Sequence, residues 1–130
     1  MAHYLDTSAL VKLVVAETET AALIAWLDEA NGELVSSDLA RTELLRAVRR
    51  VAPDRAVRAR EVLDSITLLD LTTQICEEAA RIDPPALRTL DALHLSVALD
   101  LGDDLETIVT YDDRLREAAT ANGVPTTAPA

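Results

Sequence analysis

Four acidic residues of this chain have sequence neighbours that favour a role in chemistry. They are Asp6, Glu43, Asp91 and Asp112. Carboxylates that gather without a basic partner repel one another, and this repulsion raises their pKa values or recruits cations. Because all the candidate ligand atoms are oxygens, the cation they select is a hard ion such as Mg²⁺ or Mn²⁺. Metal-assisted chemistry is therefore expected if the fold brings these residues together.

Each acid also has an ordinary structural explanation. Asp6 could merely precede a helix cap formed by the hydroxyl residues after it, and face the solvent. Glu43 could pair with Arg46 or Arg50 on its own helix. Asp91 could stand in the first turn of its helix, where the helix dipole favours an acid without any ligand. The elements that carry these residues have to decide between the two explanations.

Apolar segments that alternate with helical patterns indicate the fold class. The predicted strands are residues 3–5, 33–36, 66–71 and 107–111, with a short edge strand in the tail after 124. Helical patterns, usually two at a time, separate these strands, which is typical of a parallel sheet. We therefore predict an α/β fold with a central parallel β-sheet of four to five strands and helices on both faces.

This architecture can bring the four acids to one place. Asp6 and Asp112 follow strands directly, and open α/β sheets bind ligands beyond the carboxyl ends of their strands. Glu43 lies in the helix after the second strand, and Asp91 lies at the start of the most apolar helix. All four can therefore reach a pocket at the same sheet edge. No phosphate-cradling or nucleophile-elbow glycine pattern competes, since the three glycines fall at predicted turns.

The composition indicates one soluble domain spanning residues 1–130. Hydrophobic residues make up 49% and charged residues 27% of the chain, an ordinary globular balance. The single cysteine, Cys76, excludes an internal disulfide, and we predict that its side chain is part of the core. No stretch reads as a signal sequence or a membrane span, so a cytoplasmic protein without membrane contact is expected.

The net charge of −11 argues at first sight against a nucleic-acid partner. Seven of the twelve basic residues, however, lie within residues 41–60, opposed there only by Glu43 and Asp54. A basic block with five excess positive charges therefore stands in an otherwise acidic chain. A solvated helical surface is an adequate explanation of such a block, and a contact with a polyanion is the functional alternative.

Four fragments together resemble the PIN-domain ribonucleases, and within them the VapC-type toxins of bacterial toxin–antitoxin pairs. The fragments are Leu5-Asp6-Thr7-Ser8-Ala9-Leu10, Thr42-Glu43-Leu44-Leu45-Arg46-Ala47, Leu90-Asp91-Ala92-Leu93-His94-Leu95 and Val109-Thr110-Tyr111-Asp112-Asp113-Arg114-Leu115. The resemblance covers essentially the whole chain. Each fragment is weak alone, but their order and spacing make the combination specific.

The resemblance implies a PIN-like fold and a metal-dependent endoribonuclease that holds Mg²⁺ or Mn²⁺. By motif match, Asp6 and Asp91 are expected as primary metal ligands, with Glu43 and Asp112 completing a catalytic site. Three hydroxyl residues are expected around these ligands: Thr7, Ser8 and Thr110. Asp113 matches the motif less well than Asp112 and is interpreted as an ordinary first-turn acid. One or two metal ions are both compatible with this pattern.

The same resemblance implies the partners. An RNA substrate, a cognate VapB-type antitoxin that covers the active site and a homodimer of the toxin are expected. Arg46, Arg49 and Arg50, in the basic block, are our hypothesis for the contact with the RNA backbone. The sequence does not distinguish transfer, ribosomal and messenger RNA as the target.

Other classes of protein use acids at strand ends. A phosphoacceptor signalling domain needs a lysine late in the chain, but the only lysine is Lys12. A haloacid-type phosphatase needs an acid two residues after the first one, where Ser8 stands. A catalytically inactive PIN-like binding module remains an alternative, although all four acids are present.

Overall fold

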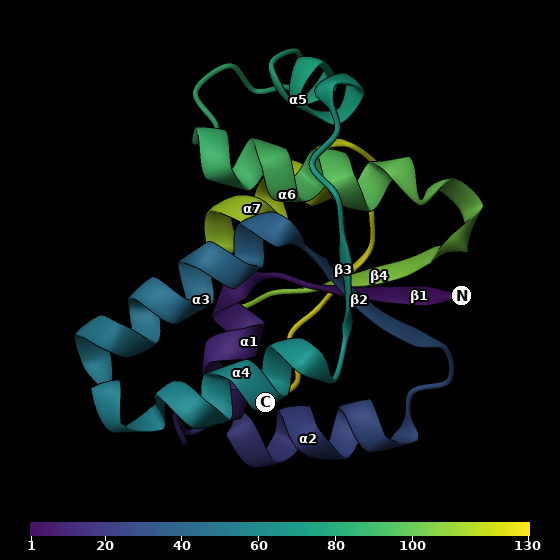
Figure 1. Ribbon diagram of the computed structural model, residues 1–130. Helices are drawn as coiled ribbons and strands as arrows, with labels where there is room; N and C mark the ends of the chain where they lie inside the picture. The colour runs from purple at the N-terminus through teal and green to yellow at the C-terminus, as the bar shows by residue number, and fades with distance from the viewer.

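A five-stranded sheet, in which all neighbouring strands are parallel, forms the centre of the structure (Figure 1). The computed structural model describes residues 1–130. The strands are β1 (Ala2–Leu5), β2 (Glu33–Ser37), β3 (Thr67–Leu69), β4 (Leu105–Val109) and β5 (Thr126–Thr127), in the order β3-β2-β1-β4-β5. This confirms the predicted α/β class, including the short edge strand in the tail.

Seven helices cover the two faces of the sheet. On one face lie α1 (Thr7–Val14), α2 (Thr20–Glu29), α3 (Asp38–Val51) and α4 (Ala56–Asp64), and on the other α5 (Thr73–Ala79), α6 (Thr89–Asp100) and α7 (Asp113–Ala121). Short 3₁₀ turns at Pro53–Arg55 and Gly102–Asp104 precede α4 and β4. Parallel strands cross over with one handedness, so the reversal of strand order after β3 moves the later helices to the opposite face.

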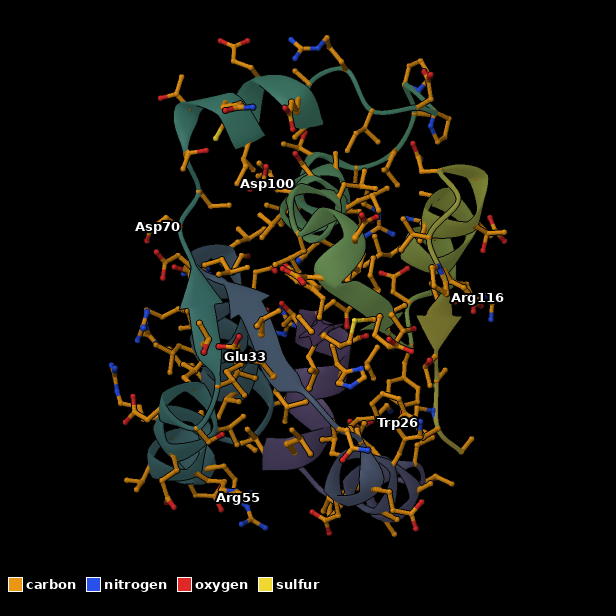
Figure 2. All side chains as sticks on the ribbon, turned by 90° about the vertical axis from the view of Figure 1, so that its right-hand side faces the viewer. Trp26, Glu33, Arg55, Asp70, Asp100 and Arg116 are labelled. Atoms are coloured by element: carbon orange, nitrogen blue, oxygen red, sulfur yellow. The ribbon has the colours of Figure 1, made fainter.

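The core consists of two apolar layers separated by the sheet. Tyr4 and Ile108 point into the layer beneath α5, α6 and α7, whereas Leu5 and Val109, one residue further along, point into the layer of α1 to α4. This is the two-residue alternation of a strand that is buried on both sides. The side chains of Arg55, Asp70, Asp100 and Arg116 lie at the periphery, outside these layers (Figure 2).

The topology places a switch point between β1 and β4. The chain proceeds from β1 to β2 and β3 in one direction, and then returns to add β4 on the other side of β1. The loops that follow β1 and β4 therefore diverge to opposite faces and open a crevice at the carboxyl ends of these strands. Asp6 follows β1 immediately, and Thr110 follows β4.

Several local predictions are wrong. Cys76 is exposed, because Ile75 and Ala79 occupy the buried side of α5. Val51 is apolar but has an exposed fraction of 63% at the end of α3. The alternative explanation of Asp6, a solvent-facing residue before a helix cap, does not hold, since Asp6 is buried and is itself the N-cap of α1. A separate finding concerns the lengths of the helices: none is long and apolar enough to cross a bilayer.

Leu44 is expected to contribute strongly to stability, because it fixes α3 against α1 in a core where its side chain is fully buried. Leu44→Ala should lower the free energy of unfolding by about 2–5 kcal/mol in denaturant titrations. Val51→Ala on the same helix removes an exposed apolar side chain and should change it by about 0.5 kcal/mol or less. Equal effects of the two substitutions would contradict this description of the core.

Candidate functional site

Three of the predicted site acids meet at the crevice between β1 and β4. Burial raises the pKa of Asp91, and the negative charges of Asp112 and Asp6 raise it further. The three carboxylates therefore share one electrostatic environment, as the strand-end argument predicted. Glu43 reaches the same region from α3, because its contacts are Thr7 on α1 and His94 on α6.

Asp6 is the most tightly held of the acids. Its Oδ1 accepts hydrogen bonds from the Ser8 hydroxyl (2.6 Å) and from the Ala9 N–H (3.1 Å), and its Oδ2 accepts one from the Thr110 hydroxyl (2.6 Å). The residue has an exposed fraction of only 4%. Burial raises the pKa of Asp6 more than these hydrogen bonds lower it. Its carboxylate is therefore rigidly placed but poorly compensated in charge.

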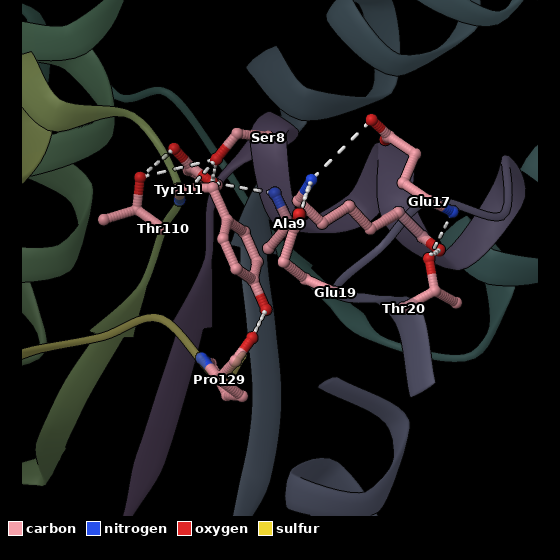
Figure 3. A network of polar contacts seen from close by, with 10 residues as sticks. Ser8, Ala9, Glu17, Glu19, Thr20, Thr110, Tyr111 and Pro129 are labelled. Atoms are coloured by element: carbon pink, nitrogen blue, oxygen red, sulfur yellow. Dashed lines mark hydrogen bonds and ion pairs between the residues drawn. The ribbon is translucent and has the colours of Figure 1, made fainter. Parts of the chain in front are cut away.

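Hydroxyl groups join the ends of β1 and β4 around this carboxylate. The Ser8 hydroxyl lies 3.4 Å from the Thr110 hydroxyl and accepts a hydrogen bond from the Tyr111 N–H (2.9 Å), as Figure 3 shows. Thr110 also accepts from the N–H of Asp112 (3.1 Å). Ser8 and Thr110 therefore contact Asp6 directly, whereas Thr7 contacts a different acid.

Glu43 is anchored through one oxygen only. Its Oε1 accepts a hydrogen bond from the Thr7 hydroxyl (2.7 Å) and lies 2.6 Å from Nε2 of His94. Burial raises the pKa of Glu43, but the hydrogen bonds from His94 and Thr7 outweigh it, so the net shift is downward. The alternative pairing of Glu43 with Arg46 or Arg50 does not occur.

Asp112 and Asp113 have different local roles. Asp112 is the N-cap of α7, and its Oδ1 accepts from the N–H groups of Arg114 (2.8 Å) and Leu115 (3.3 Å). Asp113 is exposed and forms an ion pair with Arg116 at 3.1 Å. Asp113 is therefore a first-turn surface acid, as its position in the motif indicated.

Asp91 provides the test of whether a cation suits this pocket. Its Oδ2 is buried and has no hydrogen-bond partner, and a buried charge without a partner is costly. A hard cation among carboxylate oxygens would satisfy that atom, so the donor set fits Mg²⁺ or Mn²⁺. No three His, Cys, Asp or Glu side chains already stand in a metal-binding arrangement. The acids thus lie in one region at the ends of β1 and β4 but are not closed into a ligand cage.

The only lysine is directed away from the acids. Lys12 Nζ pairs with Glu19 (2.6 Å) and lies 4.7 Å from the centre of the Tyr111 ring. The Tyr111 hydroxyl donates to the Pro129 carbonyl (2.6 Å) (Figure 3). Lys12 thereby fastens α1 to the start of α2 and to the C-terminal tail. No lysine neutralises the pocket.

The basic block forms a separate feature on α3. Arg46, Arg49 and Arg50 alone line a surface hollow of about 420 Å³. None of the three forms an ion pair, although Arg41 on the same helix approaches Asp38 at 4.0 Å. Arg46 and Arg50 follow Glu43 by three and seven residues, so they lie on the same face of α3 one and two turns further along.

Sequence reasoning missed two basic groups and one contact near the acids. Arg88 and Arg114 are exposed, lie close in sequence to Asp91 and Asp112, and form no ion pair; the charge of Arg88 lowers the pKa of Asp91. His94 was interpreted as a hydrogen-bonded structural histidine, and it is hydrogen-bonded. Its partner Glu43 could not be identified from the sequence, because the two residues lie on different helices.

The raised pKa of Asp6 predicts a pH-dependent stability when metal is chelated. A carboxyl group with a raised pKa in the folded state contributes stability below its unfolded pKa, about 3.9, and this contribution is lost as the pH rises through the folded pKa. Asp6→Asn retains an amide oxygen for Ser8 and Ala9 and carries no charge. Thermal unfolding in EDTA should therefore show Asp6→Asn gaining stability over the wild type as the pH rises from 4 to 8, and a constant difference would contradict the prediction.

Comparisons with known proteins identify the family. The PIN domain family model matches residues 3–121. Two Mycobacterium tuberculosis proteins, Ribonuclease VapC47 and Ribonuclease VapC35, are 41% and 43% identical to this chain over 130 residues, which cover 97% of it and 96% of each relative.

Solved structures share the fold at low sequence identity. Mycobacterium tuberculosis VapC20, described as a toxin that cleaves the sarcin-ricin loop, has a TM-score of 0.78 at 18% identity, covering 98% of this chain and 99% of that one. VapBC2 from Rickettsia felis, solved with a DNA fragment from its promoter, has a TM-score of 0.75 at 14% identity, covering both chains fully. The fold, the family model and the close relatives agree: this chain belongs to the PIN-domain family and, within it, to the VapC ribonucleases.

Proposed function

We propose that this protein is the toxin of a toxin–antitoxin pair and hydrolyses RNA phosphodiester bonds with Mg²⁺ or Mn²⁺ as cofactor. The observation that carries the proposal is the buried, unpartnered Oδ2 of Asp91, whose carboxylate is electrostatically coupled to Asp112 and Asp6. Such a pocket repels a phosphodiester unless a cation is present. The membership of the VapC ribonucleases supports RNA as the substrate.

Asp6 and Asp91 are the primary metal ligands in this proposal, and Glu43 and Asp112 complete the site. Asp6 keeps a fixed position because Ser8 and Thr110 hold its two oxygens. The other three acids each have an oxygen without a protein hydrogen bond, namely Oε2 of Glu43, Oδ2 of Asp91 and Oδ2 of Asp112. These free oxygens, together with the lone pairs that Asp6 does not use in its hydrogen bonds, are available to a metal ion.

The chemistry follows from these roles. When bound, the cation lowers the pKa of a coordinated water and stabilises the charge that develops on the phosphate in the transition state. In this proposal Glu43 and Asp112 orient the attacking water through their free oxygens, and one of them accepts its proton. The leaving oxygen takes a proton from solvent as its bond to phosphorus breaks. Thr7, Ser8 and Thr110 keep the carboxylates in place, since hydrogen bonds to ligand residues tune a metal site.

Arg46, Arg49 and Arg50 contact the RNA backbone in this proposal. Their hollow lacks any acid, and they continue along α3 from Glu43. At a rise of about 1.5 Å per residue, Arg46 and Arg50 lie roughly 5 and 10 Å further along the helix axis than Glu43. An RNA strand with one phosphate in the acidic pocket can thus place neighbouring phosphates over these guanidinium groups.

A VapB-type antitoxin that covers the acidic pocket and a homodimer of the toxin are the proposed protein partners. Structures with the same fold include a toxin–antitoxin complex from Klebsiella pneumoniae, with a TM-score of 0.73 at 17% identity. Leu23 on α2 and Leu44 on α3 are buried in this chain's own core and offer no surface for such a contact. Ile24 and Val51 remain exposed on the same helices.

Asp6→Asn should reduce the rate of RNA cleavage by more than about 100-fold, since even residues that only support a metal ligand cost 10–100-fold when changed. Cleavage of total RNA with Mg²⁺ or Mn²⁺ tests this expectation. Asp113→Asn is the matched control, because Asp113 is an exposed acid that pairs only with Arg116. Equal cleavage by wild type and Asp6→Asn would refute the proposed site, and chelation by EDTA should abolish wild-type cleavage.

Replacing Arg49 and Arg50 together with glutamine should weaken RNA binding and flatten its salt dependence. Loss of two phosphate contacts lowers the slope of log K against log[salt] by about 1.4 for single-stranded RNA. The measurement uses the Asp6→Asn background, so that the RNA stays intact. Arg55→Gln with Arg60→Gln removes the same charge from exposed positions outside α3, and an equal change in this control would assign the effect to net charge alone.

A further inference from the structure

His94 is the buried titratable residue of the site to which the proposed chemistry assigns no role. Its exposed fraction is 3%, and it lies on α6 one turn after Asp91. We propose that His94, itself oriented by Tyr4, is a positioning residue that holds Oε1 of Glu43 and so presents the other carboxylate oxygen to the acidic pocket. This inference rests on the proposed function, because it concerns how Glu43 serves the metal site.

A continuous chain of short hydrogen bonds connects β1, α6 and α3. The Tyr4 hydroxyl lies 2.7 Å from Nδ1 of His94, and Nε2 of the same ring lies 2.6 Å from Oε1 of Glu43. The two rings meet edge to face, with centroids 5.8 Å apart and an interplanar angle of 75°. Tyr4 is fully buried, so the chain begins in the apolar core and ends at the pocket.

The proton on each atom of this chain can be assigned. A tyrosine phenol keeps its proton at neutral pH and donates it when buried. The Tyr4 hydroxyl lies 2.7 Å from Nδ1 of His94, with the hydroxyls of Ser36 and Ser37 also beside it. Oε1 of Glu43 is a carboxylate oxygen and can only accept, so Nε2 of His94 is the donor of that hydrogen bond. A ring with its proton on Nε2 offers Nδ1 as the acceptor for the Tyr4 hydroxyl.

The consequence for Glu43 is asymmetric. Oε1 accepts from both His94 and Thr7, whereas Oε2 accepts from no protein group. Donors from two helices fix the plane of the carboxylate, because α1 supplies Thr7 and α6 supplies His94. A histidine with only a structural role needs hydrogen-bond partners for its ring nitrogens, but any polar groups of the core would serve. Here one nitrogen contacts a proposed ligand, which is the arrangement that orients metal-binding carboxylates.

Calorimetry of Mn²⁺ binding to the full chain tests the proposal without a measurement of activity. We expect His94→Leu to raise the dissociation constant by about 10–100-fold. His94→Gln should recover part of this loss, because its amide can still donate to Glu43. His3→Gln is the matched control, since His3 is the only other histidine, is similarly buried, and has its one hydrogen bond to the Asn31 carbonyl and its ring against Trp26, away from the acids. The affinity of the His3→Gln variant for Mn²⁺ should equal that of the wild type.

The imidazole nitrogens give a second, spectroscopic measurement on the metal-free protein. Long-range ¹H–¹⁵N spectra should show His94 as the Nε2–H tautomer, and Tyr4→Phe should change that pattern while it preserves the ring packing. Tyr4→Phe should also weaken Mn²⁺ binding, so it replaces His94→Leu if the latter does not fold. Neither effect is expected if His94 only fills the core.

The outcomes separate this inference from the proposed function. Absence of Mn²⁺ binding in the wild type would overturn the metal site and this proposal together. Wild-type binding with unchanged affinity in His94→Leu and Tyr4→Phe would overturn the positioning role alone. An Nδ1–H tautomer of His94 would overturn the proposed direction of the hydrogen bonds and with it the role of Tyr4.

Discussion

The whole arrangement depends on keeping several carboxylates close together in a partly buried crevice without neutralising them. Uncompensated acids in such a place are costly, and the raised pKa values of Asp6 and Asp91 reflect that cost. The protein compensates only with neutral donors around Asp6, namely two hydroxyls and a backbone N–H. These donors fix the position of the carboxylate but leave its negative charge for a cation.

The sheet order makes this clustering possible. Asp6 ends β1 and caps α1 at the same time, so the residue is placed by the backbone as well as by its side-chain contacts. Thr110 reaches its other oxygen only because β4 is hydrogen-bonded directly to β1. The switch point between these two strands sends the following helices to opposite faces, which leaves room for Glu43 and Asp91 to approach from different sides.

The sequence was sufficient to predict the features that depend on pattern. Alternating strands and helices gave the parallel sheet, and strand-end positions indicated that Asp6 and Asp112 face one edge. What failed depended on tertiary contacts. Cys76 has apolar neighbours in its helix, yet the rotation of α5 exposes it. The contact of His94 with Glu43 joins residues 51 positions apart, and no local spacing encodes it.

The four acids are anchored to different degrees, and the differences indicate how the site is built. Asp6 uses both oxygens on the protein, Glu43 and Asp112 use one each, and Asp91 has a buried oxygen with no partner at all. The fold therefore provides a fixed acid at the centre and leaves coordinating capacity on the surrounding ones. Lys12, the one lysine that could cancel this excess charge, is held against Glu19 and Tyr111 instead. In the proposed function a bound cation supplies the compensation that these acids lack, and the same lack of compensation that weakens the empty fold would favour that ion.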